Sequence, residues 1–236
     1  MTTPFSLDPD PNLPAPELTA AESPVAILRR RLTQGHGRLL VLLSTSVVWL
    51  MDTLLMRRLE AHHQVAGTAH ALLLLLEKLS TLAFIIVTLG MALALYRSRH
   101  QRLFAWTLGY LVIAMMQVIA NVASMVVTSS AIKGGGLTNL WDVAAVYMES
   151  VIVFMFIYIF LDVTTPGGAF VWPSRDGEPP PVPHLLDYLF ISLNVNSTYG
   201  PTSEVLISRP AKLFMALQVL LAILMLTVLI ARAVSA

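Results

Sequence analysis

Five long apolar stretches alternate with polar linkers along this chain. A helix needs about 20 mostly apolar residues to cross the hydrocarbon core of a bilayer, and each stretch is close to that length or longer. Helix is the expected structure because an open strand in lipid would leave its backbone N–H and C=O groups unpaired. We therefore predict an all-α membrane protein with five transmembrane helices, over residues 39–56, 71–96, 103–128, 143–163 and 213–231.

A sixth, shorter apolar stretch, residues 184–193, precedes the last long one. A helix of this length reaches about 15 Å, half of the hydrocarbon core, so it can enter the membrane but cannot cross it. Asp187 near its start favours the helix dipole, and Pro183 suits the first turn. The pattern predicts a re-entrant pore helix with these apolar side chains on one face: Leu185, Leu186, Leu189, Phe190 and Leu193.

Small polar residues follow this short helix, in the sequence NVNSTYGPTSE over residues 194–204. Non-helical backbone is tolerated at membrane depth only where it is buried in protein or lines water. Its carbonyl and hydroxyl oxygens are uncharged ligands that can replace part of the hydration shell of a cation. We therefore predict a filter-like loop and ion pathway at Asn196, Ser197, Thr198, Tyr199 and Gly200. Asn194 is a further candidate pore residue.

The composition agrees with lipid as the main solvent. Of the 236 residues, 56% are hydrophobic and only 12% are charged, and the mean hydropathy is +0.72, which is too apolar for a soluble domain. We expect a multi-pass protein of the cell membrane, in contact with membrane lipid. The net charge of +1 gives no indication of nucleic-acid binding. Because the chain has no cysteine, disulfides, thiolate metal sites and thiol nucleophiles are excluded.

The C-terminal part of the chain resembles a known family. Its order of outer helix, short helix, polar loop and last helix is similar to the pore module of tetrameric potassium-type channels, and more closely to bacterial ion-channel-like membrane proteins. The resemblance covers residues 141–236 and implies a homotetramer that conducts monovalent cations. The segments that carry it are DYL at 187–189, STYGPT at 197–202, RPAKL at 209–213 and ARAV at 231–234.

The filter-like loop departs from the potassium pattern at two positions. Thr198 stands where that filter has a glycine, and Pro201 stands where it has an aspartate. A β-branched residue resists the backbone angles that let successive carbonyls point the same way. Potassium selectivity is therefore not expected. The last helix also lacks a glycine in its middle, so the sequence gives no support for a gating hinge there.

The chain divides into three predicted regions. Residues 1–36 are a disordered, proline-rich tail and pre-membrane segment, residues 37–138 a three-helix transmembrane bundle, and residues 139–236 the pore-like module. The leading hypothesis is an oligomeric cation channel whose pore is formed by residues 184–201 and the last helix. The alternative is a non-conducting membrane scaffold or regulatory subunit that keeps a degenerate pore fold.

Polar side chains inside the other spans have two interpretations. Gln117, Asn121, Ser124 and Thr128 form a stripe down the third span, which either joins helices or lines a wet path.

Glu149, about two turns into the fourth span, is a candidate ion or proton ligand, with pairing to Lys78 or another helix as the alternative. Gln218 in the last span is a candidate pore residue, and packing is the alternative. Asp52 in the first span is a further candidate.

No enzyme class is indicated by the sequence. We find no Ser-His-Asp order, phosphate-binding glycine loop or cofactor fingerprint, and KGGGLTN at 133–139 lacks the ending of a P-loop. His62, His63 and His70 lack the spacing of a metal site. We expect neither catalysis nor a cofactor.

Two features of the sequence disagree about the membrane orientation. Pore loops of the resembled channels enter from outside. Arginines 29–31 and 38, however, precede the first span, and Arg97, Arg99 and Arg102 lie between the second and third. The positive-inside rule puts both groups in the cytoplasm, and the short helix would then enter from the cytoplasmic side.

Overall fold

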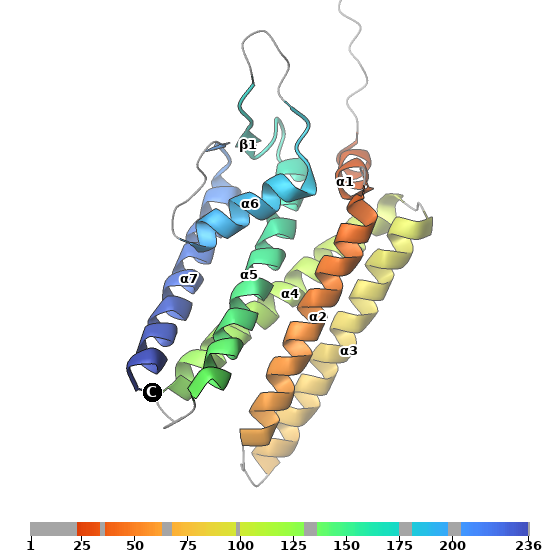
Figure 1. Cartoon of the computed structure of the whole chain (residues 1–236). Coiled ribbons are helices and arrows are strands. Elements are labelled where there is room, and N and C mark those ends of the chain that lie inside the picture. Colours follow the sequence, from red (N-terminus) through yellow and green to blue (C-terminus); the bar gives the residue numbers. More distant parts are fainter. Residues whose placement is uncertain are drawn as a thin grey trace, which may run out of the picture.

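The computed structural model describes residues 23–33, 36–62, 68–97, 100–129, 136–174, 181–197 and 204–235 (Figure 1). Within α2 and α3 the side chains of residues 54–80 are not among those described. Seven helices are present in these ranges: α1 (Pro24–Thr33), α2 (Gly37–His62), α3 (Thr68–Arg97), α4 (His100–Ser129), α5 (Gly136–Thr164), α6 (Leu185–Asn196) and α7 (Arg209–Ser235). Two short strands accompany them: β1 (Phe170–Val171) and β2 (Val205–Leu206).

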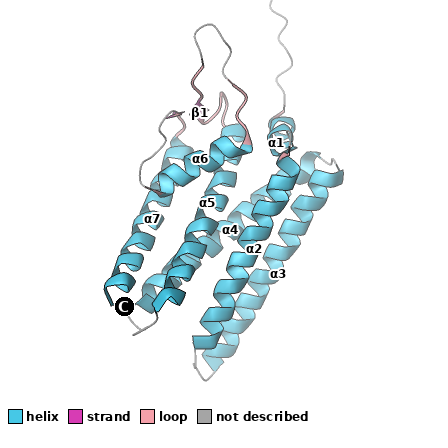
Figure 2. Cartoon of the chain, viewed as in Figure 1, coloured by secondary structure: helices cyan, strands magenta, loops and turns pink. Residues whose placement is uncertain are grey.

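The five predicted apolar stretches are helical, in α2, α3, α4, α5 and α7 (Figure 2). Among the described residues, three segments are long and apolar enough to cross a membrane: Arg102–Val126, Trp141–Thr164 and Arg209–Ala231. Thr81–Arg97 in α3 is a shorter apolar segment. The all-helical fold with membrane-spanning helices is confirmed at this level, and membrane crossing by α2 and α3 stays a prediction.

Helix α5 occupies the centre of the bundle. It contacts α2 and α4 on one side and α6 and α7 on the other, and α4 also contacts α7. In its apolar segment 72% of the residues are buried, against 28% in α7. The predicted three-helix bundle and the predicted pore-like module therefore pack on each other through both α5 and α7, although much of α7 faces outward.

The α3–α4 pair depends on a close approach at one glycine. A Cβ atom at Gly90 would lie 2.5 Å from the indole of Trp106, so only glycine lets the ring lie against α3.

Helix α1 was not predicted from the sequence. Leu28 and Leu32 are buried against the bundle, where α1 contacts α2, α4 and α5. A ten-residue helix with two buried leucines and three arginines gives too short an apolar pattern to be recognised without its neighbours.

The connection after α5 is rich in proline and glycine, and it contains one short strand. Phe170–Val171 pairs antiparallel with Val205–Leu206, so the ends of the long connection are joined beside the start of α7. Prolines and glycines exclude helix there but leave a two-residue strand pair open. This pair sets where the chain enters and leaves the region around α6.

Candidate ion pathway and buried polar clusters

The end of α5 holds the connection to α6 through one carboxylate. Asp162 Oδ1 accepts hydrogen bonds from the backbone N–H groups of Ala169 (2.7 Å) and Phe170 (3.2 Å). Gly167 and Gly168 adopt positive φ angles of 78° and 86°, which turn the chain back so that these N–H groups reach the carboxylate. Without this turn the connection could not return over the end of α5.

The same carboxylate fixes the first half of α6. Tyr188 Oη donates to Asp162 Oδ2 at 2.5 Å, and its ring packs edge-on against Phe170 and Trp172. Burial, and then the neighbouring Asp162 charge, raises the pKa of the Tyr188 phenol, so the hydroxyl stays protonated and remains a donor.

Helix α6 begins at Leu185, one residue later than the sequence predicted. Asp187 Oδ2 accepts a hydrogen bond from the His184 N–H at 2.6 Å, which confirms its place in the first turn. Pro183 precedes the cap instead of lying in the first turn, and its carbonyl accepts from Arg31 Nη1 at 2.7 Å. The helix start is thus tied to α1.

Hydrogen bonds along α6 show how far it descends beside α5. Ser192 Oγ donates to the Val151 carbonyl at 2.7 Å. Thr164 ends α5, so Val151 lies 164 − 151 = 13 residues earlier, about 20 Å along the helix at 1.5 Å per residue. Near the end of α6, Ser197 Oγ lies 2.9 Å from Tyr147 Oη, four residues deeper still. Helix α6 therefore runs from the end of α5 to its middle.

Three helices meet at Gln218 of α7, which is fully buried. Its Oε1 accepts from Tyr158 Oη at 2.6 Å, and its Nε2 donates to the Ser192 carbonyl and Ser192 Oγ, both at 2.9 Å. We call Tyr158, Ser192 and Gln218 the Gln218 cluster. It joins α5, α6 and α7 and contains no ionisable acid or base other than the Tyr158 phenol. Gln218 therefore packs inside the protomer.

The two faces of α6 differ from the predicted arrangement. Of the five apolar residues expected on one face, Leu186, Phe190 and Leu193 are exposed. The buried face instead consists of Leu185, Tyr188, Ile191, Ser192, Val195 and Asn196. Both faces are apolar enough for membrane depth, and the polar atoms on the inner face are matched by α5 and α7. Apolar spacing alone could not tell which face turns inward.

The predicted filter residues are only partly described. Thr198, Tyr199 and Gly200 lie outside the described residues. Asn194 and Asn196 were expected in a non-helical loop, but α6 extends through Asn196 and Ser197 is its C-cap. Asn196 is buried, with its Oδ1 3.4 Å from Ser150 Oγ and its Nδ2 3.5 Å from the Tyr147 carbonyl. Here side-chain bonds to α5 prolong the helix beyond its apolar pattern.

Asn194 is half-buried, and its Nδ2 has no hydrogen-bond partner among the residues that the structure describes.

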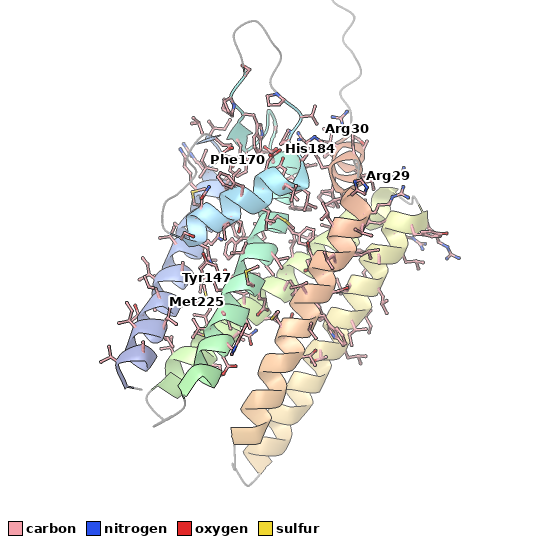
Figure 3. All side chains as sticks on the ribbon, in the orientation of Figure 1. Arg29, Arg30, Tyr147, Phe170, His184 and Met225 are labelled. Carbon is pink, nitrogen blue, oxygen red and sulfur yellow. The ribbon has the colours of Figure 1, made fainter. Side chains whose placement is uncertain are left out.

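A cavity of about 180 Å³ lies where α6 ends between α5 and α7. Most of its lining is apolar, and Tyr147, Asn196 and Ser197 supply its few polar atoms. Figure 3 labels two of the lining residues, Tyr147 of α5 and Met225 of α7. Water needs only about 10–15 Å³ of such volume and a few polar partners, so this cavity can admit water. The chain thus leaves α6 at a mainly apolar cavity half-way along the bundle.

A second group of polar side chains lies on the other side of α5. Gln117 Nε2 donates to Asp52 Oδ2 at 3.1 Å. Asn121 Nδ2 donates to Glu149 Oε2 at 2.9 Å and lies 3.5 Å from Asp52 Oδ1. We call Asp52, Gln117, Asn121 and Glu149 the carboxylate cluster; all are buried, and Gln117, the most exposed, is 6% exposed. It joins α2, α4 and α5.

The contacts of the carboxylate cluster distinguish between the two interpretations of some polar residues in α4 and α5. Gln117 and Asn121 of the polar stripe join helices, and Glu149 binds another helix through Asn121. The Lys78 side chain lies outside the described part of the chain, so its pairing with Glu149 stays a prediction. Asp52 and Glu149, 97 positions apart (149 − 52), were each noticed in the sequence, but nothing in their spacing showed that they meet.

Comparison with known proteins gives no match: no protein family, curated protein or solved structure is similar to this chain. The function must therefore be argued from the residues and the geometry above.

Proposed function

We propose that this chain is the subunit of an oligomeric, cation-conducting channel of the cell membrane, with a pore formed around the end of α6 and by α7. The observation that carries the proposal is the depth of α6. A helix of 12 residues is too short to cross a bilayer, yet its hydrogen bonds follow α5 to its middle. Such a descent is what a re-entrant pore helix requires.

The proposed pore needs several copies, and the outward apolar surfaces are compatible with contacts to lipid or to neighbouring copies. Leu186 and Phe190 of α6 are exposed, as are Leu213, Leu220 and Ile223 of α7. One re-entrant loop cannot surround an ion alone, so neighbouring copies must supply the rest of the pore. We propose a homotetramer, as the resemblance to tetrameric channels implies.

A cation is the proposed permeant species. The sequence has no lysine or arginine between residues 188 and 203, and the oxygens of Ser197 and of the following residues are uncharged ligands. At the end of α6, Ser197 lines the cavity between α5 and α7, so the pathway would begin there and continue through Thr198, Tyr199 and Gly200.

The structure sharpens the question of orientation. Arg29 and Arg30 of α1 lie at the same end of the bundle as His184, where α6 starts (Figure 3), and Arg31 binds the Pro183 carbonyl. The positive-inside rule then assigns this end to the cytoplasm, and we propose that α6 enters from the cytoplasmic side.

Because the chain has no cysteine, a single His184→Cys variant tests the orientation. A membrane-impermeant maleimide should label it in inside-out vesicles and not in intact cells. Labelling in intact cells would reverse the orientation.

The alternative, a non-conducting scaffold or regulatory subunit, is favoured by a specific observation. Asn196 and Gln218, two predicted pore residues, bind inside their own protomer. A degenerate pore fold would keep such internal contacts without conducting.

Ion flux separates the two functions. Purified protein reconstituted into proteoliposomes should conduct sodium or potassium, and Thr198→Ala combined with Tyr199→Ala should lower the flux severalfold. Ser46→Ala is the matched control, because Ser46 is exposed and bonds only to its own helix through the Leu42 carbonyl. No flux from well-folded oligomers, or flux unchanged by the double substitution, would favour the scaffold.

A further inference from the structure

The carboxylate cluster lies away from the proposed pore and has its own chemistry. It belongs to the α2–α4–α5 side of the central helix, whereas the end of α6 and the cavity lie on the α6–α7 side. Its two carboxylates come from helices far apart in the sequence and are bridged by the amide of Asn121. A role for this cluster does not depend on the proposed channel function.

Two buried carboxylates need a positive charge beside them if both are ionised. The cost of an ionised group in an apolar interior is high unless it is paired with an opposite charge. The donors that reach Asp52 and Glu149 in the described part of the chain are the neutral amides of Gln117 and Asn121. Amide donors satisfy the oxygens that they reach but do not balance the charge.

Two further oxygens of the cluster have no partner among the described residues. Glu149 Oε1 and Gln117 Oε1 are buried and accept no hydrogen bond there, and the nearby hydroxyl of Tyr110 also has no partner. Glu149 is fully buried and Gln117 is 94% buried (100 − 6). Unpaired acceptors at such depth are costly, and a bound cation satisfies several of them at once.

The kind of cation follows from the oxygen set. Oxygen ligands of this type suit alkali and alkaline-earth ions. Calcium takes about six to eight oxygens and magnesium demands an octahedron. The cluster offers two carboxylates and a few neutral oxygens. Three of its four carboxylate oxygens already accept hydrogen bonds from amides, so too few oxygens are left for calcium or magnesium.

We propose that Asp52, Gln117 and Glu149 bind one monovalent metal cation, sodium or potassium, between α2, α4 and α5. The ion lies against Glu149 Oε1 and Gln117 Oε1 and reduces the repulsion between the two carboxylates. Its binding stabilises the contact of the first half of the chain with the central helix. The site is separate from the conduction pathway.

Thermal unfolding of the purified full chain in detergent tests this site. The unfolding temperature is measured in sodium, potassium and N-methylglucamine chloride at equal ionic strength. It should rise with sodium or potassium to a plateau, relative to N-methylglucamine. Isothermal titration calorimetry with sodium chloride and with potassium chloride should show saturable binding of the same ion.

Two variants assign the effect to the cluster. Asp52→Asn combined with Glu149→Gln keeps the shapes of the side chains and should abolish the saturable rise. Asp142→Asn, two turns earlier on α5, should retain it. An unfolding temperature that is the same in all three salts would overturn the proposal, as would a rise that survives the double substitution. A cluster neutralised by protons or by a lysine ammonium gives the first of these results, and flux through the pore is measured separately.

Discussion

The two sides of helix α5 carry polar clusters of opposite character. Toward α6 and α7, the Gln218 cluster has one partner or more for each side-chain polar atom of Tyr158, Ser192 and Gln218. Toward α2 and α4, the carboxylate cluster has two acids and two oxygens without a partner among the described residues. Both clusters are buried, so burial alone does not separate a structural contact from a binding site.

This difference distinguishes polar residues that hold helices together from polar residues that can bind a ligand. A neutral cluster whose hydrogen bonds are complete fixes one arrangement of helices and gains nothing from a ligand. A charged cluster with unpaired oxygens is incomplete without a positive charge. Gln218 therefore orders α5, α6 and α7 around the proposed pore, whereas Glu149 belongs to the proposed cation site on the other side of α5.

The largest expected effect is that of Gln218→Leu. The substitution leaves the Tyr158 hydroxyl and the Ser192 carbonyl without the Gln218 amide, and one buried orphan group costs about 1–3 kcal/mol. We expect the free energy of unfolding to fall by about 3 kcal/mol in total, measured by denaturant titration in mixed micelles.

Thr227→Val is the matched control on the same helix, because Thr227 is exposed and bonds only to the Ile223 carbonyl of α7. Equal stability of the Gln218→Leu variant and this control would contradict a structural role for Gln218.

A smaller loss is expected for Ser192→Ala. The hydroxyl donates to the Val151 carbonyl, but Gln218 keeps its bond to the Ser192 backbone carbonyl. The expected decrease in unfolding free energy is about 1 kcal/mol, by the same titration. Ser46→Ala serves as the exposed control. A loss as large as that of Gln218→Leu would mean that the depth of α6 depends on Ser192 alone.

The smallest effect, with the opposite sign, is expected for Glu149→Gln in buffer with N-methylglucamine as the only added cation. It removes a buried charge; its one carbonyl oxygen can still accept from the Asn121 amide, and its NH2 group takes the place of the unpaired Oε1. The unfolding free energy should rise by up to about 1 kcal/mol. A clear loss of stability would place the carboxylate cluster with the structural contacts and remove the contrast between the two sides of α5.

Much of the fold follows from the apolar pattern. Stretches near 20 apolar residues have one economical structure in lipid, so the helices α2 to α5 and α7 were predictable, with ends that differ from the predicted spans by up to seven residues. The start of α6 was also predictable, because Asp187 gives a local capping signal. Helix α1 and the β1–β2 pair were not, because their stability comes from distant partners.

The candidate sites were predictable only as residue types. Glu149 and Gln218 are conspicuous in apolar helices, yet their roles depend on Asn121 and Ser192, which are distant in the sequence. The extension of α6 to Asn196 depends on bonds to Tyr147 and Ser150 of α5. Local periodicity contains no information about such contacts.

Cation flux through reconstituted oligomers tests the central claim most directly. Proteoliposomes that contain the purified protein should take up sodium or potassium, and the Thr198→Ala, Tyr199→Ala double variant should lose most of that uptake while Ser46→Ala keeps it. Oligomers of normal stability that conduct neither ion would contradict the channel proposal.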